Sequence, residues 1–159
     1  MTSRRSMLAT LAALPFAAGF AQRATAAPAK FQVAYPDAVW KQRLGADAYY
    51  VLRQSGTERA GTSPLNGEHR AGIFTCKGCA LPLFSSKTKY DSGTGWPSFW
   101  QALPGVAQSS GSRLSMFGIE VHCARCGGHL GHIFDDGPRP TGKRYCINGV
   151  ALTFTPAKA

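Results

Sequence analysis

Short hydrophobic runs alternate with polar turn signals through the second half of the chain. Asp, Gly, Pro and Thr clusters separate five runs of strand-like composition. The expected strands cover residues 72–75, 81–84, 113–122, 130–134 and 145–155. The preceding segment, residues 55–72, is rich in Gly, Thr, Ser, Pro and Asn and is expected to be a loop. This pattern predicts a mainly β, mostly antiparallel fold.

Two short helices are expected before the strands. The first covers residues 37–44, with Asp37 as its N-cap and with Trp40 and Leu44 four residues apart on one face. Gly45 separates this helix from the second. The second helix covers residues 46–54, and its apolar residues are Tyr49, Tyr50 and Leu52.

The N-terminal segment has the features of an export signal. Arg4 and Arg5 precede an apolar run over residues 7–21, and small residues at 24–27 offer an Ala-x-Ala cleavage site. The paired arginines favour the twin-arginine route of bacteria, and an ordinary secretory signal is the alternative. The run contains Pro15 and falls short of the ~20 residues that span a bilayer, so stable membrane insertion is not expected.

Three segments are therefore expected in an exported, periplasmic protein: a signal peptide (1–26), a flexible lead (27–35) and one domain (36–159). The formal net charge is +10. Because the basic residues are scattered, with no run of five, they indicate a basic surface rather than a nucleic-acid site. A monomer is expected.

Four of the five cysteines form two Cys-x-x-Cys pairs, Cys76 with Cys79 and Cys123 with Cys126, with 43 residues between the pairs. One such turn presents two sulfurs to an ion at about 2.3 Å, and two turns complete the tetrahedron that zinc prefers. The sequence therefore predicts one structural Zn²⁺, without an open coordination position, that clips together two distant turns.

Two disulfides are the alternative, because exported proteins tend to oxidise their cysteines. A disulfide within a Cys-x-x-Cys turn is usually redox-active, and two such pairs in one small domain are an uncommon combination, so zinc is favoured. The twin-arginine route exports folded proteins, so zinc would be bound before the cysteines meet an oxidising compartment. Gly78, Gly127 and Gly128 are expected to let the backbone bend tightly at the two turns.

Cys146 stands alone. Lys143 and Arg144 immediately precede it, and their positive charge is expected to lower the pKa of its thiol. Asn148 would share its face on a strand, and His129 and His132 are close in sequence. An unpaired cysteine with available histidines is a candidate nucleophile, whereas an inert buried cysteine is the alternative.

Several motifs in the same order resemble the type B methionine sulfoxide reductases. They are Gly56-Thr57-Glu58-Arg59, Leu83-Phe84-Ser85-Ser86, Gly95-Trp96-Pro97-Ser98-Phe99, His129-Leu130-Gly131-His132-Ile133-Phe134, Asp136-Gly137-Pro138 with Pro140-Thr141-Gly142, and Arg144-Tyr145-Cys146-Ile147-Asn148. The two Cys-x-x-Cys pairs also lie where zinc-binding members of that family carry theirs. The resemblance runs from Trp40 to Phe154.

The resemblance implies two antiparallel sheets with short N-terminal helices. It also implies an enzyme, a peptide-methionine (R)-S-oxide reductase that repairs oxidised proteins by reducing the R epimer of methionine sulfoxide. Cys146 would attack the sulfoxide sulfur and become a sulfenic acid, which is the first step of cysteine oxidation.

The resemblance implies roles for five further residues. Trp96 would offer an apolar face to the S-methyl group. His129, His132 and Asn148 would orient water and the sulfoxide oxygen, and one histidine would supply a proton. Arg144 would help to hold the thiolate. Sulfoxide oxygen leaves poorly unless it is protonated, and a half-apolar substrate requires an aromatic wall opposite polar groups.

Each of these side chains also has a purely structural interpretation. Trp96 could fill a core, and Asn148 could cap a turn. His129 and His132 are three residues apart, so on a regular strand they would face opposite ways. A bulge at Gly131 would be needed to bring both histidines to one pocket.

The sequence departs from the family at Thr94. Many members carry a second cysteine there, which resolves the sulfenic acid as a disulfide. If zinc holds four cysteines, none is left for this step, so an external thiol, either a thioredoxin-like protein or a small thiol, is expected to reduce Cys146. A second departure is Gly149-Val150-Ala151, where relatives often have small hydroxyl residues.

Two other functions fit parts of the pattern. A zinc ribbon that binds nucleic acid would group basic and aromatic residues on one face. A Cys-His hydrolase or acyl transferase would need an oxyanion hole and would form an acyl intermediate on Cys146.

Overall fold

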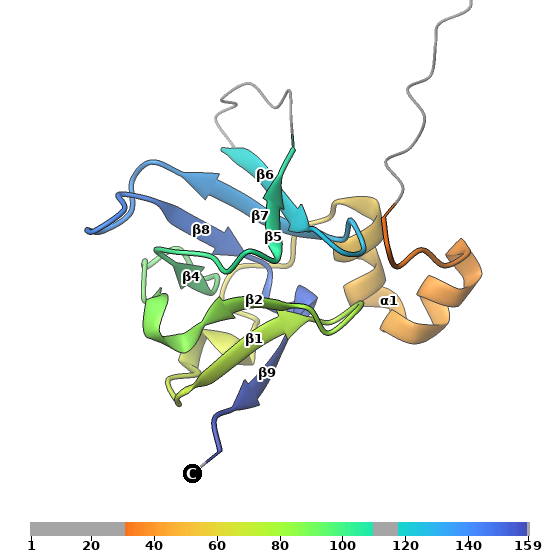
Figure 1. Ribbon diagram of the computed structural model, residues 1–159, viewed down its shortest axis with the longest axis horizontal. Coiled ribbons are helices and arrows are strands. Elements are labelled where there is room, and N and C mark those ends of the chain that lie inside the picture. The colour runs from red at the N-terminus through yellow and green to blue at the C-terminus, as the bar shows by residue number, and fades with distance from the viewer. Residues whose placement is uncertain (1–30, 110–117, 159) are drawn as a thin grey trace, which may run out of the picture.

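The computed structural model describes residues 31–109 and 118–158, which form two antiparallel sheets, one α-helical element and three short 3-10 helices (Figure 1). The expected signal peptide, residues 1–26, lies outside the described residues. Among the described residues, no helix is long and apolar enough to cross a membrane.

The smaller sheet has three strands and the larger has six, and every pair of neighbouring strands is antiparallel. In spatial order, the smaller sheet contains β2 (Pro82–Ser85), β1 (Gly72–Cys76) and β9 (Leu152–Pro156). The larger sheet contains β3 (Lys89–Tyr90), β4 (Ser98–Phe99), β8 (Arg144–Ile147), β7 (His129–Phe134), β6 (Ile119–Cys123) and β5 (Val106–Gln108). This architecture confirms the mainly β fold and the two antiparallel sheets.

Residues 145–155, expected as one strand, are divided between the two sheets. The chain leaves the larger sheet after Ile147, makes the 3-10 helix η3 (Gly149–Ala151) and enters the smaller sheet as β9. The single-strand prediction is wrong because the first two residues of η3 donate their backbone N–H groups to the Glu58 carboxylate instead of to a neighbouring strand.

Two further 3-10 helices lie in connecting segments. The segment expected to be a loop contains η1 (Pro64–Gly67), and η2 (Ser86–Thr88) follows β2. Ser63 caps η1, because its hydroxyl accepts a hydrogen bond from the Leu65 backbone N–H at 3.2 Å. The strand expected over residues 113–122 begins, within the described part of the chain, at Ile119.

The helical element α1 (Asp37–Gln54) is interrupted at Gly45, whose φ of 72° and ψ of 175° are not helical. The prediction of two helices separated at this residue is confirmed. Asp37 is not the N-cap. Pro36 occupies that position with an extended ψ of 151°, and the Asp37 carboxylate instead accepts a hydrogen bond from the Tyr49 hydroxyl.

One face of α1 packs on the domain, where it contacts β7 and η3. Trp40 and Leu44 are buried on this face, as their spacing predicted. Tyr49 and Leu52 are buried as well, but Tyr50 is 52% exposed, so only part of the expected apolar set of the second helix contributes to the core.

The lead that was expected to be flexible is held against the domain where the structure describes it, over residues 31–35. The Val33 backbone N–H donates to the Arg125 carbonyl at 3.1 Å. The Tyr35 ring meets the Trp40 ring edge-on, with 5.0 Å between their centroids.

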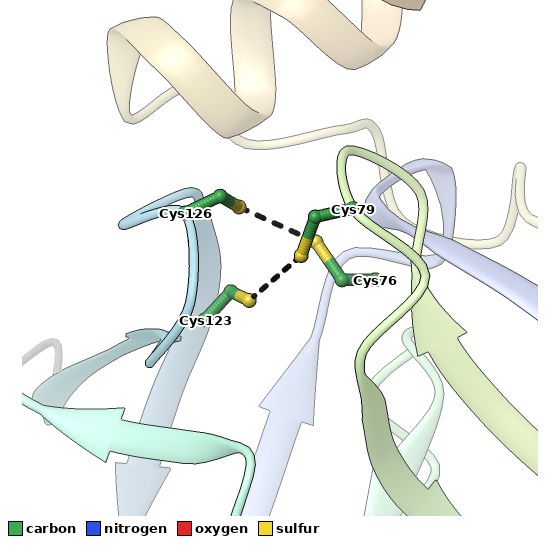
Figure 2. Close-up of side chains that lie close together, drawn as sticks. All are labelled: Cys76, Cys79, Cys123 and Cys126. Carbon is green, nitrogen blue, oxygen red and sulfur yellow. Dashed lines mark hydrogen bonds between the residues drawn. The ribbon is translucent and has the colours of Figure 1, made fainter. Parts of the chain in front are cut away.

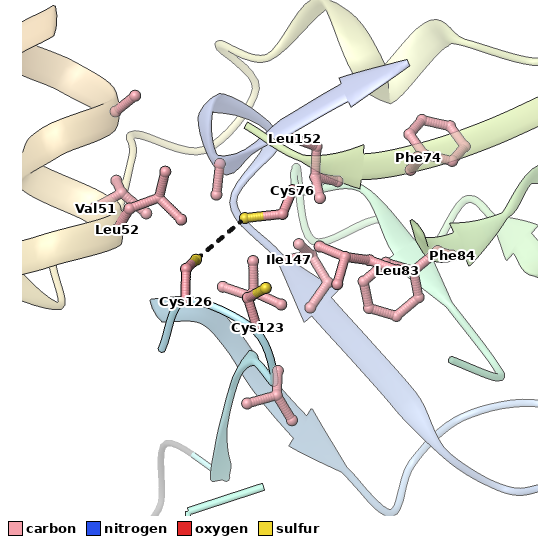
Figure 3. Close-up of a cluster of buried hydrophobic side chains, with 14 of the residues drawn as sticks. Val51, Leu52, Phe74, Cys76, Leu83, Phe84, Cys123, Cys126, Ile147 and Leu152 are labelled. Carbon is pink, nitrogen blue, oxygen red and sulfur yellow. Dashed lines mark hydrogen bonds between the residues drawn. The ribbon is translucent and has the colours of Figure 1, made fainter. Parts of the chain in front are cut away.

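The core between the two sheets is built around three buried phenylalanines. Phe74 and Phe84 come from the smaller sheet and Phe99 from the larger one. The rings of Phe84 and Phe99 stack at 4.3 Å, and Phe74 meets Phe99 edge-on at 5.0 Å. Full burial of each ring stabilises the fold by about 1.5–3 kcal/mol. Figure 3 shows the core continuing from Phe74 and Phe84 to Cys76 and Cys126 beside the helix.

Candidate functional site

The four paired cysteines meet between the turn after β1 and the turn after β6 (Figure 2). The Cys76 and Cys126 sulfurs are 3.7 Å apart, and those of Cys79 and Cys123 are 3.4 Å apart. Both distances exceed the ~2.05 Å of a disulfide and approach the ~3.8 Å edge of a tetrahedron with ligands at about 2.3 Å. All four sulfurs lie within 4.8 Å of one another, so this cluster could hold one metal ion.

The electrostatics of the cluster favour a cation. Hydrogen bonding with Cys126 lowers the pKa of Cys123 to about 2, whereas hydrogen bonding with Cys123 raises the pKa of Cys126 to about 12 and that of Cys76 far above its ordinary value. Four sulfurs this close do not all ionise without a positive charge among them. An ion with a preference for thiolates supplies that charge.

The two cysteine turns have the same backbone design. The residue after each second cysteine is left-handed, Ala80 with a φ of 59° and Gly127 with a φ of 68°. Each donates its N–H to the carbonyl of the first cysteine, Ala80 to Cys76 at 2.7 Å and Gly127 to Cys123 at 2.8 Å. The flexibility expected of Gly78 is therefore not what bends the first turn, because the left-handed position belongs to Ala80.

The helix α1 supports the second turn through Arg53. Its guanidinium donates to the Cys126 carbonyl at 3.0 Å and lies over the Trp40 ring, 4.9 Å from the centroid. An arginine in this position ties the helix both to the cluster and to its own buried aromatic residue. The cysteine cluster thus joins both sheets and the helix.

Cys146 lies in a row of residues that crosses the larger sheet. The Cα partners are Ser98 with Cys146 on β4 and β8, Cys146 with His132 on β8 and β7, and His132 with Glu120 on β7 and β6. Residues directly opposite one another in antiparallel strands share a face. The row therefore places the partly exposed Cys146 thiol beside a hydroxyl on one side and an imidazole on the other.

The expectation of a lowered pKa for Cys146 is wrong. Burial raises the pKa of this thiol above its ordinary value, and it outweighs the Thr94 hydrogen bond and the Arg144 charge, both of which lower it. Arg144 also shares its charge with Asp136, since its guanidinium donates two hydrogen bonds to that carboxylate, at 2.8 and 2.7 Å. Its position is fixed by the Phe134 ring, whose centroid is 4.2 Å away.

The two predicted histidines come together as expected. The step from His129 to Gly131 on β7 covers two residues, whereas the paired step from His122 to Val121 on β6 covers one, so β7 bulges here. Gly131 in this bulge has a φ of 152°. The imidazole rings of His129 and His132 are 5.4 Å apart. The irregularity overcomes the strand alternation that would have placed them on opposite faces.

The two histidines have different environments. His129 is buried, and its Nδ1 lies 2.8 Å from the Glu120 carboxylate. Its Nε2 is buried without a hydrogen-bond partner among the described residues, which is uncommon and marks an atom available to a ligand or water. Burial lowers the pKa of His132, so this imidazole is neutral at pH 7.

Asn148 and Trp96 are held in place by the Glu58 segment. The Asn148 amide oxygen accepts from the Glu58 backbone N–H at 2.9 Å, and its nitrogen donates to the Leu130 carbonyl at 3.0 Å. The half-buried Trp96 donates its indole N–H to the Glu58 carbonyl at 3.1 Å. One N–H hydrogen of the Asn148 amide remains for another partner.

Glu58 holds together the segments of the candidate site, and sequence reasoning missed these contacts. It was noticed only as part of a family motif, with no role assigned. Its carboxylate accepts from the backbone N–H groups of Gly149 at 2.5 Å and Val150 at 3.0 Å. No local pattern could reveal this, because the partners are 90 to 92 residues away. Ser98 and Glu120 were missed for the same reason, since strand pairing alone brings Ser98 opposite Cys146 and Glu120 opposite His132.

A comparison with protein families matches residues 44–156 to the SelR domain. The peptide methionine sulfoxide reductase MsrB of Methanosarcina mazei is 52% identical over 118 residues, which cover 73% of this chain and 84% of that protein. The protein of the same name from Thiobacillus denitrificans is 48% identical over 122 residues, covering 76% and 92%. The chloroplastic peptide methionine sulfoxide reductase B1 of Arabidopsis thaliana is 51% identical over 115 residues, covering 71% and 57%.

The matched region includes the larger sheet, the smaller sheet and both cysteine turns, and so takes in Cys146 and the four-sulfur cluster. About half of its residues are identical in relatives from an archaeon, a bacterium and a plant. The chain therefore belongs to the MsrB family of SelR-domain proteins.

Proposed function

We propose that this protein is a peptide-methionine (R)-S-oxide reductase that repairs oxidised proteins, with Cys146 as its nucleophile. The observation that carries the proposal is the cross-strand row, which sets the single cysteine outside the four-sulfur cluster beside His132. Relatives that share about half of the residues are named peptide methionine sulfoxide reductases. The nucleic-acid and acyl-transfer alternatives have no such support.

The reaction transfers one oxygen atom from substrate to enzyme. The Cys146 thiolate attacks the sulfoxide sulfur, a proton is added to the oxygen, and methionine leaves as the oxygen moves to Cys146 as a sulfenic acid. A thiol then displaces water from the sulfenic acid and forms a mixed disulfide. A second thiol releases Cys146 as the thiol and leaves as the external disulfide, so two thiols are oxidised for each methionine formed.

The surrounding residues position the substrate and the proton. Trp96 offers its ring to the S-methyl group, and its indole N–H is already engaged by Glu58. His129 and His132 receive the sulfoxide oxygen through water, and one of them donates the proton. Asn148 offers its remaining N–H hydrogen, and Arg144 adds positive charge beside the thiolate.

The cluster of Cys76, Cys79, Cys123 and Cys126 is proposed to hold a structural Zn²⁺. The four thiolate donors and the near-tetrahedral spacing of the sulfurs support this ion over harder metals. Such an ion adds free energy of folding and takes no part in the reaction. The position of Cys146, in a separate cross-strand row, agrees with this division of roles.

The reductant is proposed to be an external thiol, either a thioredoxin-like protein or a small thiol. Thr94 occupies the place of the resolving cysteine of many relatives, and its hydroxyl is 3.8 Å from the Cys146 sulfur. The other four cysteines lie in the four-sulfur cluster. The sequence features of residues 1–26 support export by the twin-arginine route to the periplasm, where a monomer would act on oxidised proteins.

A steady-state assay tests the function directly. The purified protein would be given the separate R and S sulfoxides of a blocked methionine, with dithiothreitol as reductant. R-only reduction that Cys146→Ser abolishes is the expected result. Equal turnover of both epimers, or full activity in Cys146→Ser, would reject the proposal.

The reductant is tested by trapping. With Cys146 oxidised by substrate, a thiol added in limiting amount is expected to form a mixed disulfide on Cys146. A disulfide between Cys146 and one of the four clustered cysteines during turnover would show an internal reductant instead.

A further inference from the structure

Three hydroxyl groups form a chain that ends at the Cys146 sulfur. The Ser98 and Ser92 oxygens are 2.7 Å apart, Ser92 and Thr94 are 2.8 Å apart, and the Thr94 oxygen is 3.8 Å from the sulfur. The far end is anchored in the protein, because Ser98 is fully buried and donates to the Trp96 carbonyl at 3.1 Å. The sequence motifs drew attention to Thr94 alone, as the missing cysteine.

Counting hydrogens gives the chain a direction. Each hydroxyl donates one hydrogen. Because Ser98 gives its hydrogen to the Trp96 carbonyl, it can only accept from Ser92. Ser92 then accepts from Thr94, and Thr94 accepts from the S–H of Cys146. This arrangement suits the protonated thiol.

A thiolate cannot donate, so the same contacts must run the other way when Cys146 loses its proton to solvent. We infer that Thr94 is a positioning residue that donates its hydroxyl hydrogen to the Cys146 thiolate, and that Ser92 and Ser98 turn with it. Ser92 then donates to Thr94 and Ser98 to Ser92, while the Trp96 carbonyl loses its donor. Thr94, which occupies the position of the resolving cysteine of many relatives, thus helps to form the nucleophile through this row of hydroxyls.

Chained hydroxyls polarise one another, so the two serines strengthen the bond that Thr94 offers to the sulfur. Hydrogen bonds to an ionised acceptor are stronger than those between neutral groups. The thiolate needs this help because burial raises the pKa of Cys146.

Other groups around Cys146 also act on the thiolate. Arg144, on the same strand, favours it, and Asp136, paired with Arg144, disfavours it. His132 faces the thiol from β7, and burial lowers the pKa of that imidazole, so it brings little positive charge at neutral pH. Tyr90, on β3, interacts with the Cys146 charge and has its own pKa raised by burial.

The test is the pH dependence of Cys146 alkylation by iodoacetamide, with the Cys146 peptide quantified by mass spectrometry. Thr94→Val keeps the shape of the side chain and removes its hydroxyl. The alkylation midpoint is expected to rise by about one pH unit, which is about tenfold less thiolate below the midpoint. Thr94→Ser restores the donor and is expected to return the midpoint to that of wild type. A midpoint in Thr94→Val equal to that of wild type would overturn the inference.

Ser92→Ala tests the chain as opposed to Thr94 alone. It is expected to raise the midpoint less than Thr94→Val, because Thr94 keeps its hydrogen but loses the polarising donor. A Ser92→Ala midpoint equal to wild type would reject the chain. Thr155→Val, an exposed threonine of the other sheet, serves as the matched control and is expected to change nothing.

The inference rests on Cys146 being the nucleophile proposed above, but alkylation reports its thiolate without turnover. A raised midpoint in a protein that reduces neither sulfoxide epimer would keep the hydroxyl chain and reject the reductase. R-selective reduction by the wild type, with an unchanged midpoint in Thr94→Val, would keep the reductase and reject the hydroxyl chain. In an active enzyme, the loss of turnover in Thr94→Val is expected to recover as the pH rises, which a misfolded site would not show.

Discussion

Trp96 donates its indole N–H to the backbone carbonyl of Glu58 at 3.1 Å, and the carboxylate of the same glutamate accepts from the Val150 N–H at 3.0 Å. One residue thereby fixes the proposed substrate-facing ring and the turn that follows the Cys146 strand. The Glu58 N–H also donates to Asn148, so all three contacts are made by this one residue.

Replacing Glu58 by Gln is expected to loosen both the turn and the ring. The amide has one acceptor oxygen where the carboxylate has two, so one backbone N–H of η3 loses its partner. Such a loss costs about 1–3 kcal/mol of unfolding free energy, measured by urea titration. The KM for methionine-R-sulfoxide is expected to rise more than kcat falls. Asp47→Asn, the same carboxylate-to-amide change at an exposed position, is the control, and an equal effect of the two variants would contradict the role of Glu58.

The left-handed Ala80 predicts a stabilising substitution. An alanine at a φ of 59° is strained, while Gly127 fills the equivalent place in the other cysteine turn without strain. Ala80→Gly is expected to raise the unfolding free energy by up to about 1 kcal/mol. The comparison is Ala60→Gly, at an exposed position without a positive φ. There the glycine only adds conformational entropy to the unfolded chain, so the unfolding free energy is expected to fall. Destabilisation by both changes would show that the backbone at Ala80 is not strained.

The cysteine cluster predicts that metal content and folding change together. Cys79→Ser removes one of four sulfur ligands and is expected to lower both the bound zinc and the melting temperature, and a strong chelator is expected to do the same to wild type. Zinc would be quantified by atomic spectrometry on the samples used for melting. Cys146→Ser should keep its zinc and its melting temperature. A Cys79→Ser protein with unchanged stability would mean that the cluster is not a structural metal site.

The buried imidazole of His132 predicts a pH dependence of stability. Burial lowers the pKa of His132 below its ordinary value of 6.5. The unfolded chain then binds the extra proton more readily than the fold, so this contribution to stability is complete above pH 6.5 and is lost as the pH falls below it. His132→Gln should show a shallower decline in unfolding free energy over that range. Identical slopes for wild type and His132→Gln would contradict the burial of this imidazole.

Much of the fold was predictable because its signals are local. Strand composition, the spacing of Trp40 and Leu44, and Gly45 between two helices each depend on a few neighbouring residues. The cysteine spacing predicted the four-sulfur cluster, and the strand alternation even required the bulge found near Gly131.

The remaining features depend on contacts between distant segments. Glu58 holds residues 149–150 outside the strand expected there, and no residue near 150 in the sequence indicates this contact. The raised pKa of Cys146 follows from burial and from the pairing of Arg144 with Asp136, although sequence adjacency to basic residues suggested the opposite. The hydroxyls of Ser98, Ser92 and Thr94 contact one another within one short segment, but the link from Thr94 to the Cys146 sulfur exists only once β4 pairs with β8.

In the proposed reaction, oxygen passes from the substrate sulfur to Cys146, and a single turnover can follow this transfer. The protein would receive one equivalent of a blocked methionine-R-sulfoxide that carries heavy oxygen, without reductant but with dimedone present in a parallel sample. We expect one methionine per protein, the heavy oxygen on Cys146, and a dimedone adduct at that residue alone. Methionine formed with the label in water and no adduct on Cys146, or with the adduct on one of the four clustered cysteines, would contradict it.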